Sequence, residues 1–168
     1  MAQWWGRAEE LWMGNRRSES LDLRGQLDYR RKLTQQLPAT AQRVVYGASG
    51  MYLAAARVAD SSAIVEHNLY WAATASAEEA RYVVAILNST TLTDRVRPYQ
   101  ARGEHNPRHF DKYVWRLPIP LFDDEDPLHR RLATLGREAE ELVAGIALPP
   151  GRRFEAVCPP ARDGGHAG

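Results

Sequence analysis

The feature that most constrains the fold is a series of short segments of β-branched and aromatic residues, placed close together. They occupy positions 43–46, 51–54, 63–66 and 69–72. The residues between them, at 47–50, 59–62 and 67–68, are mostly Gly, Ser, Asp, Ala and Asn, which is typical of turns. Parallel strands need crossovers of a dozen residues or more, so these short separations predict antiparallel pairing.

A capped helix is expected to follow the strands. Ser76 stands three residues before Glu79, which matches the capping box, and apolar residues then recur at helical spacing. We expect a helix over residues 77–88, ended by the polar residues 88–91. A further short turn of helix is expected over residues 92–96, before Pro98.

Residues 126–146 carry the clearest helical pattern in the chain. Asp126 is a suitable N-cap, and Pro127 occupies the first helical position, where its missing N–H does no harm. Apolar residues then alternate at spacings of four and three, at Leu128, Leu132, Leu135, Ala139, Leu142 and Ile146. The predicted fold class is therefore α+β, with short antiparallel strands packed with a capped helix, followed by a long amphipathic C-terminal helix.

The N-terminal forty residues are expected to be helical. Ser20 could cap a helix with leucines at loosely helical spacing, ended by Pro38. Three tryptophans further upstream, Trp4, Trp5 and Trp12, fit either a docking segment or packing within the chain. The expected organisation is a helical docking segment (1–40), an α+β domain (41–122), the long helix (123–148) and a disordered Pro/Gly-rich tail (149–168).

Composition argues against a membrane or secreted protein. The longest uncharged stretch, 44–56, is shorter than the roughly 20 apolar residues of a membrane span, and glycines interrupt it. The N-terminus has no apolar region typical of a secretory signal. Cys158 is the only cysteine, so the chain cannot form an internal disulfide, which fits the cytoplasm.

Charge is unevenly distributed although the net charge is only +1. Residues 81–116 contain seven Lys/Arg and three Asp/Glu, whereas residues 123–141 contain seven acids and three arginines. The basic part includes an aperiodic loop, 99–112, in which arginine could grip guanine or phosphate and asparagine could read adenine. A solvated surface loop remains the alternative. After it, residues 113–117 are strand-like, and the Pro118-Ile119-Pro120 segment must leave the sheet or lie on its edge, because neither proline can donate a backbone hydrogen bond.

Common catalytic and metal-binding patterns are missing from the sequence. No glycine loop is followed by Lys-Ser/Thr, so a phosphate-binding loop is not expected. His105 and His109 are four apart, but Pro107 lies between them and no acid or cysteine has metal-site spacing nearby. One hypothesis that these two histidines allow is a small metal-dependent nuclease. Cys158 has no base beside it and is a poor nucleophile.

The order of several short motifs resembles a known family. Trp71, the segment 76–89 ending in Leu87-Asn88-Ser89, Arg102-Gly103, Phe110 and Leu117-Pro118-Ile119-Pro120 precede a leucine-rich helix. This order is similar to the C-terminal target-recognition region of N6-adenine DNA methyltransferases in restriction-modification and phage-defence systems. It also resembles recognition units of type I specificity subunits. The resemblance covers roughly residues 43–146.

The resemblance implies a DNA sequence-recognition module that is not catalytic alone. The Asn/Asp/Ser-Pro-Pro-aromatic motif that holds a flipped adenine is absent, because both Pro-Pro pairs have unsuitable neighbours. S-adenosylmethionine is therefore expected on a catalytic methyltransferase domain or subunit, which would be a partner along with double-stranded DNA. The expected DNA-binding residues are Arg97, Arg102, Gly103, His105, Asn106, Arg108, His109 and Lys112. The competing hypothesis is an assembly subunit that uses its long helix and tryptophans without contacting DNA.

Overall fold

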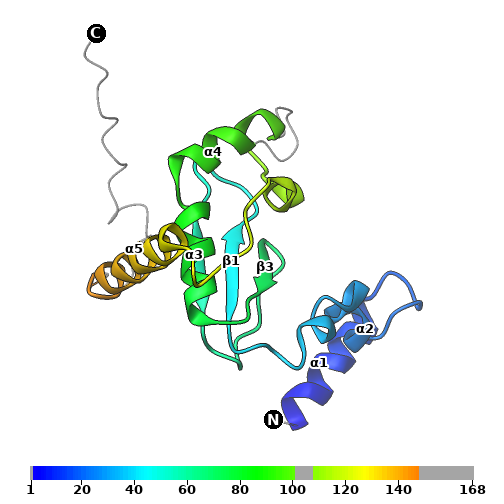
Figure 1. Cartoon of the computed structure of the whole chain (residues 1–168). Coiled ribbons are helices and arrows are strands. Elements are labelled where there is room, and N and C mark those ends of the chain that lie inside the picture. The colour runs from blue at the N-terminus through cyan, green and yellow to red at the C-terminus, as the bar shows by residue number, and fades with distance from the viewer. Residues whose placement is uncertain (1, 101–107, 148–168) are drawn as a thin grey trace.

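A three-stranded antiparallel sheet forms the centre of the molecule, in a computed structural model that describes residues 2–100 and 108–147 (Figure 1). The strand order is β2-β1-β3, with bounds β1 (Arg43–Gly47), β2 (Ala55–Val58) and β3 (Leu69–Ala73). Val45 of β1 lies opposite Ala56 on one side and Trp71 on the other. The predicted antiparallel pairing is confirmed.

Five α-helices accompany the sheet in the described residues: α1 (Ala2–Asn15), α2 (Leu23–Leu27), α3 (Ala77–Leu87), α4 (Thr90–Val96) and α5 (Pro127–Ala144). Helix α3 lies against the sheet, and α5 packs across the outer side of α3 (Figure 1). The α+β class and the long C-terminal helix are therefore confirmed. Within the described ranges, no helix combines the length and apolar character needed to cross a bilayer.

The predicted caps explain where α3 and α5 begin. The Ser76 Oγ accepts a hydrogen bond from the Glu79 amide at 3.0 Å, and the Glu79 carboxylate accepts one from the Ala75 amide at 2.6 Å. Asp126 accepts from the Leu128 amide at 2.7 Å. These side chains satisfy amides that the first helical turn leaves without a backbone partner.

The end of α3 ties three elements together through the Asn88-Ser89 pair. The Asn88 side chain accepts from the Ala55 amide at 2.8 Å and donates to the Ala55 carbonyl at 3.0 Å. It thus pairs with the first residue of β2 as a neighbouring strand would. The Ser89 Oγ accepts from the Leu92 amide at 3.1 Å and so caps α4.

The core lies between the sheet, α3, α4 and the segment after residue 108. Its buried members share apolar or aromatic character and come from both halves of the chain: Val44, Tyr46, Leu53, Ala80, Leu87, Leu92, Val96, Phe110 and Val114. Because Phe110 and Val114 belong to this cluster, the segment after the loop is fixed to the body of the molecule.

Two of the four strands predicted over residues 43–72 are wrong, because side chains bind their backbone groups. Within 51–54, the Leu53 amide donates to the Thr93 hydroxyl at 3.2 Å, and the second strand forms instead at Ala55–Val58. Within 63–66, the buried Gln36 side chain accepts from the Val65 amide at 2.8 Å and donates to the Val65 carbonyl at 3.0 Å. A segment whose polar groups are satisfied in this way does not need a strand partner.

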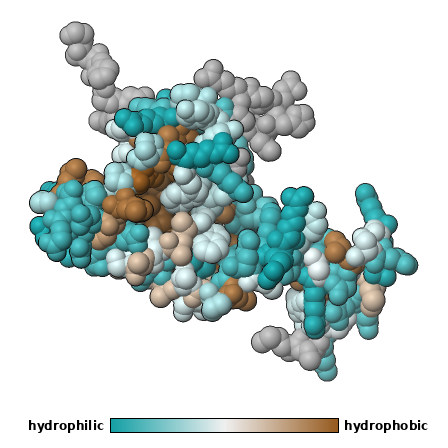
Figure 2. Space-filling view, turned by 45° about the vertical axis from the view of Figure 1, so that its right-hand side comes forward, coloured by the Kyte–Doolittle hydropathy of each residue, from teal (hydrophilic) through white to brown (hydrophobic). Residues whose placement is uncertain are grey.

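The prediction of one helix from Ser20 to Pro38 is also wrong. Asp22, not Ser20, caps α2, which has only five residues, and two 3-10 helices follow: η1 (Tyr29–Arg31) and η2 (Thr34–Gln36). The Asp28 carboxylate accepts from the Leu33 and Thr34 amides and so turns the chain. Figure 2 shows these N-terminal helices as a lobe to the right of the central body, whereas α5 lies to the left of that body.

The strand predicted over residues 113–117 is a 3-10 helix, η4 (Asp111–Arg116). Phe110 and Val114, four residues apart, are 1% and 0% exposed, whereas Trp115 is exposed. The apolar run suggested a strand, but burial follows helical spacing instead. Pro118 and Pro120 then lie in the extended linker between η4 and α5.

Helix α5 is fixed to α3 by small residues and an ion-pair network. Ala133 and Gly136 are buried against α3, and a Cβ at Gly136 would lie 2.4 Å from the Arg81 carbonyl oxygen. The Glu140 carboxylate accepts hydrogen bonds from Arg57 of β2 and from the Nε of Arg81, the latter at 3.1 Å. These contacts position α5 on one particular face.

Candidate nucleic-acid interface

The structure brings together the two ends of the basic loop. The Gln100 side chain donates to the carbonyl of Gly50 at 3.2 Å and to that of Arg108 at 3.1 Å. The Gly50 amide donates to the same Arg108 carbonyl at 3.2 Å, and the Phe110 amide donates to the Ala48 carbonyl at 2.7 Å. Gln100 and Arg108 therefore lie together, beside the turn that follows β1.

Two 3-10 helices flank this anchor point and contact each other. Tyr99, in η3 (Arg97–Tyr99), stacks on Tyr113 of η4 with ring centroids 5.6 Å apart and planes 19° apart. The guanidinium of Arg116 lies 4.9 Å from the Tyr113 ring centroid. Tyr99 is 57% exposed, so aromatic surface and positive charge reach solvent together.

The expected DNA-binding residues that the structure describes lie on this part of the chain. Arg97 begins η3 and forms an exposed ion pair with Asp94 at 3.8 Å. Arg108 is exposed, His109 is partly buried beside Ser49, and Lys112 is exposed on η4. The other four, Arg102, Gly103, His105 and Asn106, lie outside the described residues.

Arg108 has an unusual backbone. Its φ of 65° lies in the left-handed region, which costs a residue with a side chain about 1 kcal/mol or more. Its carbonyl accepts from Gly50 and Gln100, and these bonds hold the residue in place. A strained conformation kept by surrounding contacts is common where a side chain has a role in binding.

Sequence reasoning missed the contribution of Tyr99, Gln100, Tyr113 and Arg116. In a strand over residues 113–117, which the sequence predicts, Tyr113 and Arg116 would point to opposite faces. In a 3-10 helix, positions three apart are aligned, so Arg116 lies over Tyr113. The available signal was the i, i+3 pairing of tyrosine and arginine.

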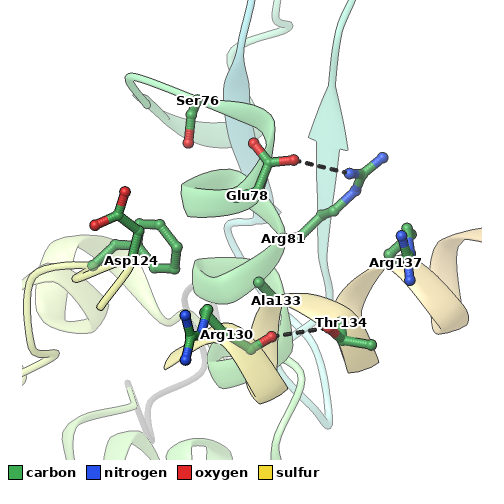
Figure 3. A pocket seen from close by; sticks show the side chains of 9 residues that line it. Ser76, Glu78, Arg81, Asp124, Arg130, Ala133, Thr134 and Arg137 are labelled. Carbon is green, nitrogen blue, oxygen red and sulfur yellow. Dashed lines mark hydrogen bonds and ion pairs between the residues drawn. The ribbon is translucent and has the colours of Figure 1, made fainter. Parts of the chain in front are cut away.

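A groove lies between α3 and α5 (Figure 3). It has a volume of about 410 Å³ and is lined by Ser76, Glu78, Arg81, Phe122, Asp124, Arg130, Ala133, Thr134 and Arg137. Arg81 pairs with Glu78 at 3.7 Å, and the Ser76 Oγ is occupied as the cap of α3. We interpret this groove as the junction between α3 and α5, because Ser76, Glu78 and Arg81 are engaged in the cap and the ion pair of α3 itself.

In the part of the chain that the structure describes, neither the groove between α3 and α5 nor the contact between Gln100 and Arg108 offers a metal centre. No group of three His, Cys, Asp or Glu side chains is placed there to hold a metal ion. His105 and Cys158, two of the residues considered for metal or nucleophilic chemistry, lie outside that part, as does the predicted tail from residue 149.

Comparison with known proteins gave no relative. No protein-family model, no curated protein and no solved structure matches the chain.

Proposed function

We propose that this chain is a DNA sequence-recognition module of an adenine-specific DNA methyltransferase, without catalytic activity of its own. The surface that binds double-stranded DNA is the one formed by η3, the anchored loop base and η4. We call it the 97–116 surface, defined by Arg97, Tyr99, Arg108, His109, Lys112, Tyr113 and Arg116.

The observation that carries this proposal is that positively charged side chains and aromatic rings lie together where η3 and η4 meet, on either side of the predicted loop. The Tyr99–Tyr113 stack joins η3 to η4, and the guanidinium of Arg116 lies over the Tyr113 ring. Arginine, lysine and tyrosine are among the side chains that contact DNA phosphates, and these contacts give affinity without reading the sequence.

Anchoring of the loop base supports a role in recognition. Because the Gln100 side chain binds the carbonyls of Gly50 and Arg108, the two residues that flank the predicted loop lose less freedom on binding than free ends would. The predicted base-reading residues, Arg102 and Asn106, lie in that loop. Arginine and asparagine make bidentate contacts to guanine and adenine, respectively.

The glycine-containing turn after β1 does not suit S-adenosylmethionine. It joins two antiparallel strands instead of a strand and a helix, and a Cβ at Gly50 would meet the Tyr52 carbonyl oxygen at 3.0 Å. The proposal therefore places S-adenosylmethionine and the flipped adenine on a catalytic domain or subunit, with which this chain acts.

The proposal can be tested with one substitution that removes charge and relaxes the backbone. Arg108→Gly should bind a fluorescein-labelled DNA duplex more weakly than the wild type, in fluorescence anisotropy on the full chain. Loss of a contact worth about 1–3 kcal/mol raises Kd about 5- to 150-fold. Glycine accepts the left-handed conformation, so the variant should stay folded.

Arg31→Gly is the matched control. Arg31 also has a positive φ, of 58°, and lies in the N-terminal lobe, so the change in charge and backbone is the same. Its Kd should equal that of the wild type. Equal losses in both variants would show nonspecific attraction, and no loss in Arg108→Gly would refute the 97–116 surface.

A further inference from the structure

The two outer strands of the sheet differ in how their open edges are covered. On β2, the open edge begins at Ala55, whose amide and carbonyl both bind the Asn88 side chain. Arg57, the next residue that turns its backbone to that edge, is tied through its side chain to Glu140 of α5. Strand β3 is the other outer strand, and none of the helices and strands labelled in Figure 1 runs along its open side.

The register of β3 on β1 decides which of its backbone groups point outward. The Thr74 amide donates to the Gln42 carbonyl at 3.1 Å, and the Ala48 amide donates to the Asn68 carbonyl at 2.9 Å. Even-numbered residues of β3 therefore turn their amides and carbonyls toward β1, and odd-numbered residues turn theirs away from it. The outward backbone groups belong to Leu69, Trp71 and Ala73.

Most of these outward groups are free to bind another strand. The Leu69 amide donates to the Glu66 carbonyl at 3.0 Å. Within the described residues, the amides of Trp71 and Ala73 and all three outward carbonyls have no hydrogen-bond partner in the protein. Proline and charged side chains protect the edges of many sheets, but β3 contains neither. Such an edge is a template for pairing with a further strand.

Strand β3 is complementary to a second copy of itself. In an antiparallel pair centred on Trp71, the Trp71 amide of each copy donates to the Trp71 carbonyl of the other. The Ala73 amide of each copy then donates to the Leu69 carbonyl of the other. Both free donors thus find an acceptor, and the Leu69 amide keeps its own bond to Glu66. A strand of another protein would need the same spacing of acceptors, whereas a second copy has it by symmetry.

The side chains also match in this register. Trp71 lies opposite Trp71 of the second copy, Leu69 opposite Ala73, and Tyr70 opposite Ala72, so every cross-strand pair is apolar or aromatic. Because the strand carries no charge, pairing with its own copy brings no like charges together. Leu69 is 39% exposed in the single chain, and Ala73 is exposed as well, so the pairing covers apolar surface.

We propose that the chain forms a two-fold symmetric homodimer in which β3 pairs antiparallel with β3 of a second copy, in the register centred on Trp71. The two three-stranded sheets then form one continuous sheet, in the order β2-β1-β3-β3-β1-β2. The two-fold axis is perpendicular to this sheet, so α3 of both copies lies on the same face. This inference does not rest on the proposed DNA binding.

A proline at the open edge tests the pairing. The Ala73 amide points away from β1, so Ala73→Pro removes a donor from the open edge and none from the bonds between β1 and β3. In sedimentation velocity on the full chain, over a concentration series without DNA, the wild type should pass from 19.0 kDa to twice that mass. Ala73→Pro should shift this transition to about tenfold higher concentration or more, because symmetry removes two hydrogen bonds at once. Ala73→Val is the matched control and should dimerise at least as well as the wild type, because valine keeps the amide and favours a strand.

Charged residues at position 71 test the register. Only a pair centred on Trp71 places this residue opposite itself, so Trp71→Lys and Trp71→Glu should each be monomeric through like-charge repulsion. An equal mixture of the two variants should recover the dimer, since lysine of one copy then lies opposite glutamate of the other.

Three results would overturn parts of this arrangement. A wild type that stays at 19.0 kDa at every concentration would exclude the homodimer and leave the β3 edge to a strand of another protein. Dimerisation of Ala73→Pro at the wild-type concentration would exclude the β3 edge as the interface. A mixture of the two Trp71 variants that stays monomeric, although Ala73→Pro behaves as expected, would exclude the register.

Discussion

The contact between α5 and α3 makes a sharp prediction at Gly136. A Cβ built at this position lies 2.4 Å from the carbonyl oxygen of Arg81 and 3.0 Å from its carbonyl carbon, and both atoms are backbone. Ordinary contacts of a Cβ begin near 3.4 Å. Gly136→Ala should therefore force α5 away from α3 by about 1 Å.

Two opposing effects set the size of the change. Alanine favours a helix over glycine by about 1 kcal/mol. Overpacking costs about 1–3 kcal/mol, and a gap of about 1 Å removes up to half of the dispersion energy at neighbouring contacts such as those of Ala133. We expect the free energy of unfolding to fall by about 1–2 kcal/mol, which lowers Tm by roughly 3–8 °C.

Urea unfolding followed by circular dichroism at 222 nm measures this loss. Gly6→Ala is the matched control, because Gly6 lies inside α1 and a Cβ there meets no atom within 4 Å. The control should leave stability unchanged or increase it, through helix propensity alone. The packing argument fails if Gly136→Ala is as stable as Gly6→Ala.

Two more predictions concern polar contacts that join elements. The pKa of Glu140 lies below its ordinary value of 4.5, because hydrogen bonds from Arg57 and then Arg81 outweigh the effect of burial. The contribution of the Glu140 carboxylate to the free energy of unfolding is therefore complete above pH 4.5 and is lost as the pH falls through its folded pKa. The urea midpoints of the wild type and of Glu140→Gln should accordingly differ at pH 7 and converge in acid. Gln36→Ala leaves the buried Val65 amide without its acceptor, which costs about 1–3 kcal/mol. Limited proteolysis should then cleave near residue 38 faster than in the wild type, and equal rates would refute this role of Gln36.

The elements that could be predicted from sequence are those whose signals are local. The caps Ser76 and Asp126 lie next to the helices they begin, and the starts of α3 and α5 agree with them. The antiparallel sheet followed from the short distances between strands. For the two helix starts, residues within a few positions of one another supply the energy.

The errors at the strands predicted over residues 51–54 and 63–66 arose where distant side chains decide. Thr93 binds the Leu53 amide from forty residues away, and Gln36 binds Val65 from twenty-nine residues away. No periodicity records such bonds. In the candidate site, the left-handed backbone of Arg108 and the joining of Gln100 to Gly50 likewise depend on tertiary contacts. The sequence therefore indicated which residue types surround the loop, but not that Gln100 and Arg108 contact each other.

The most direct test of DNA binding by the 97–116 surface is the salt dependence of Kd on duplex DNA. Each phosphate contact contributes about 0.9 to the slope of log K against log salt. The account predicts that Arg97→Ala combined with Lys112→Ala lowers this slope by nearly two relative to the wild type. Arg7→Ala combined with Lys32→Ala, in the N-terminal lobe, should leave it unchanged. An equal slope in the wild type and the first double variant would contradict the proposed surface.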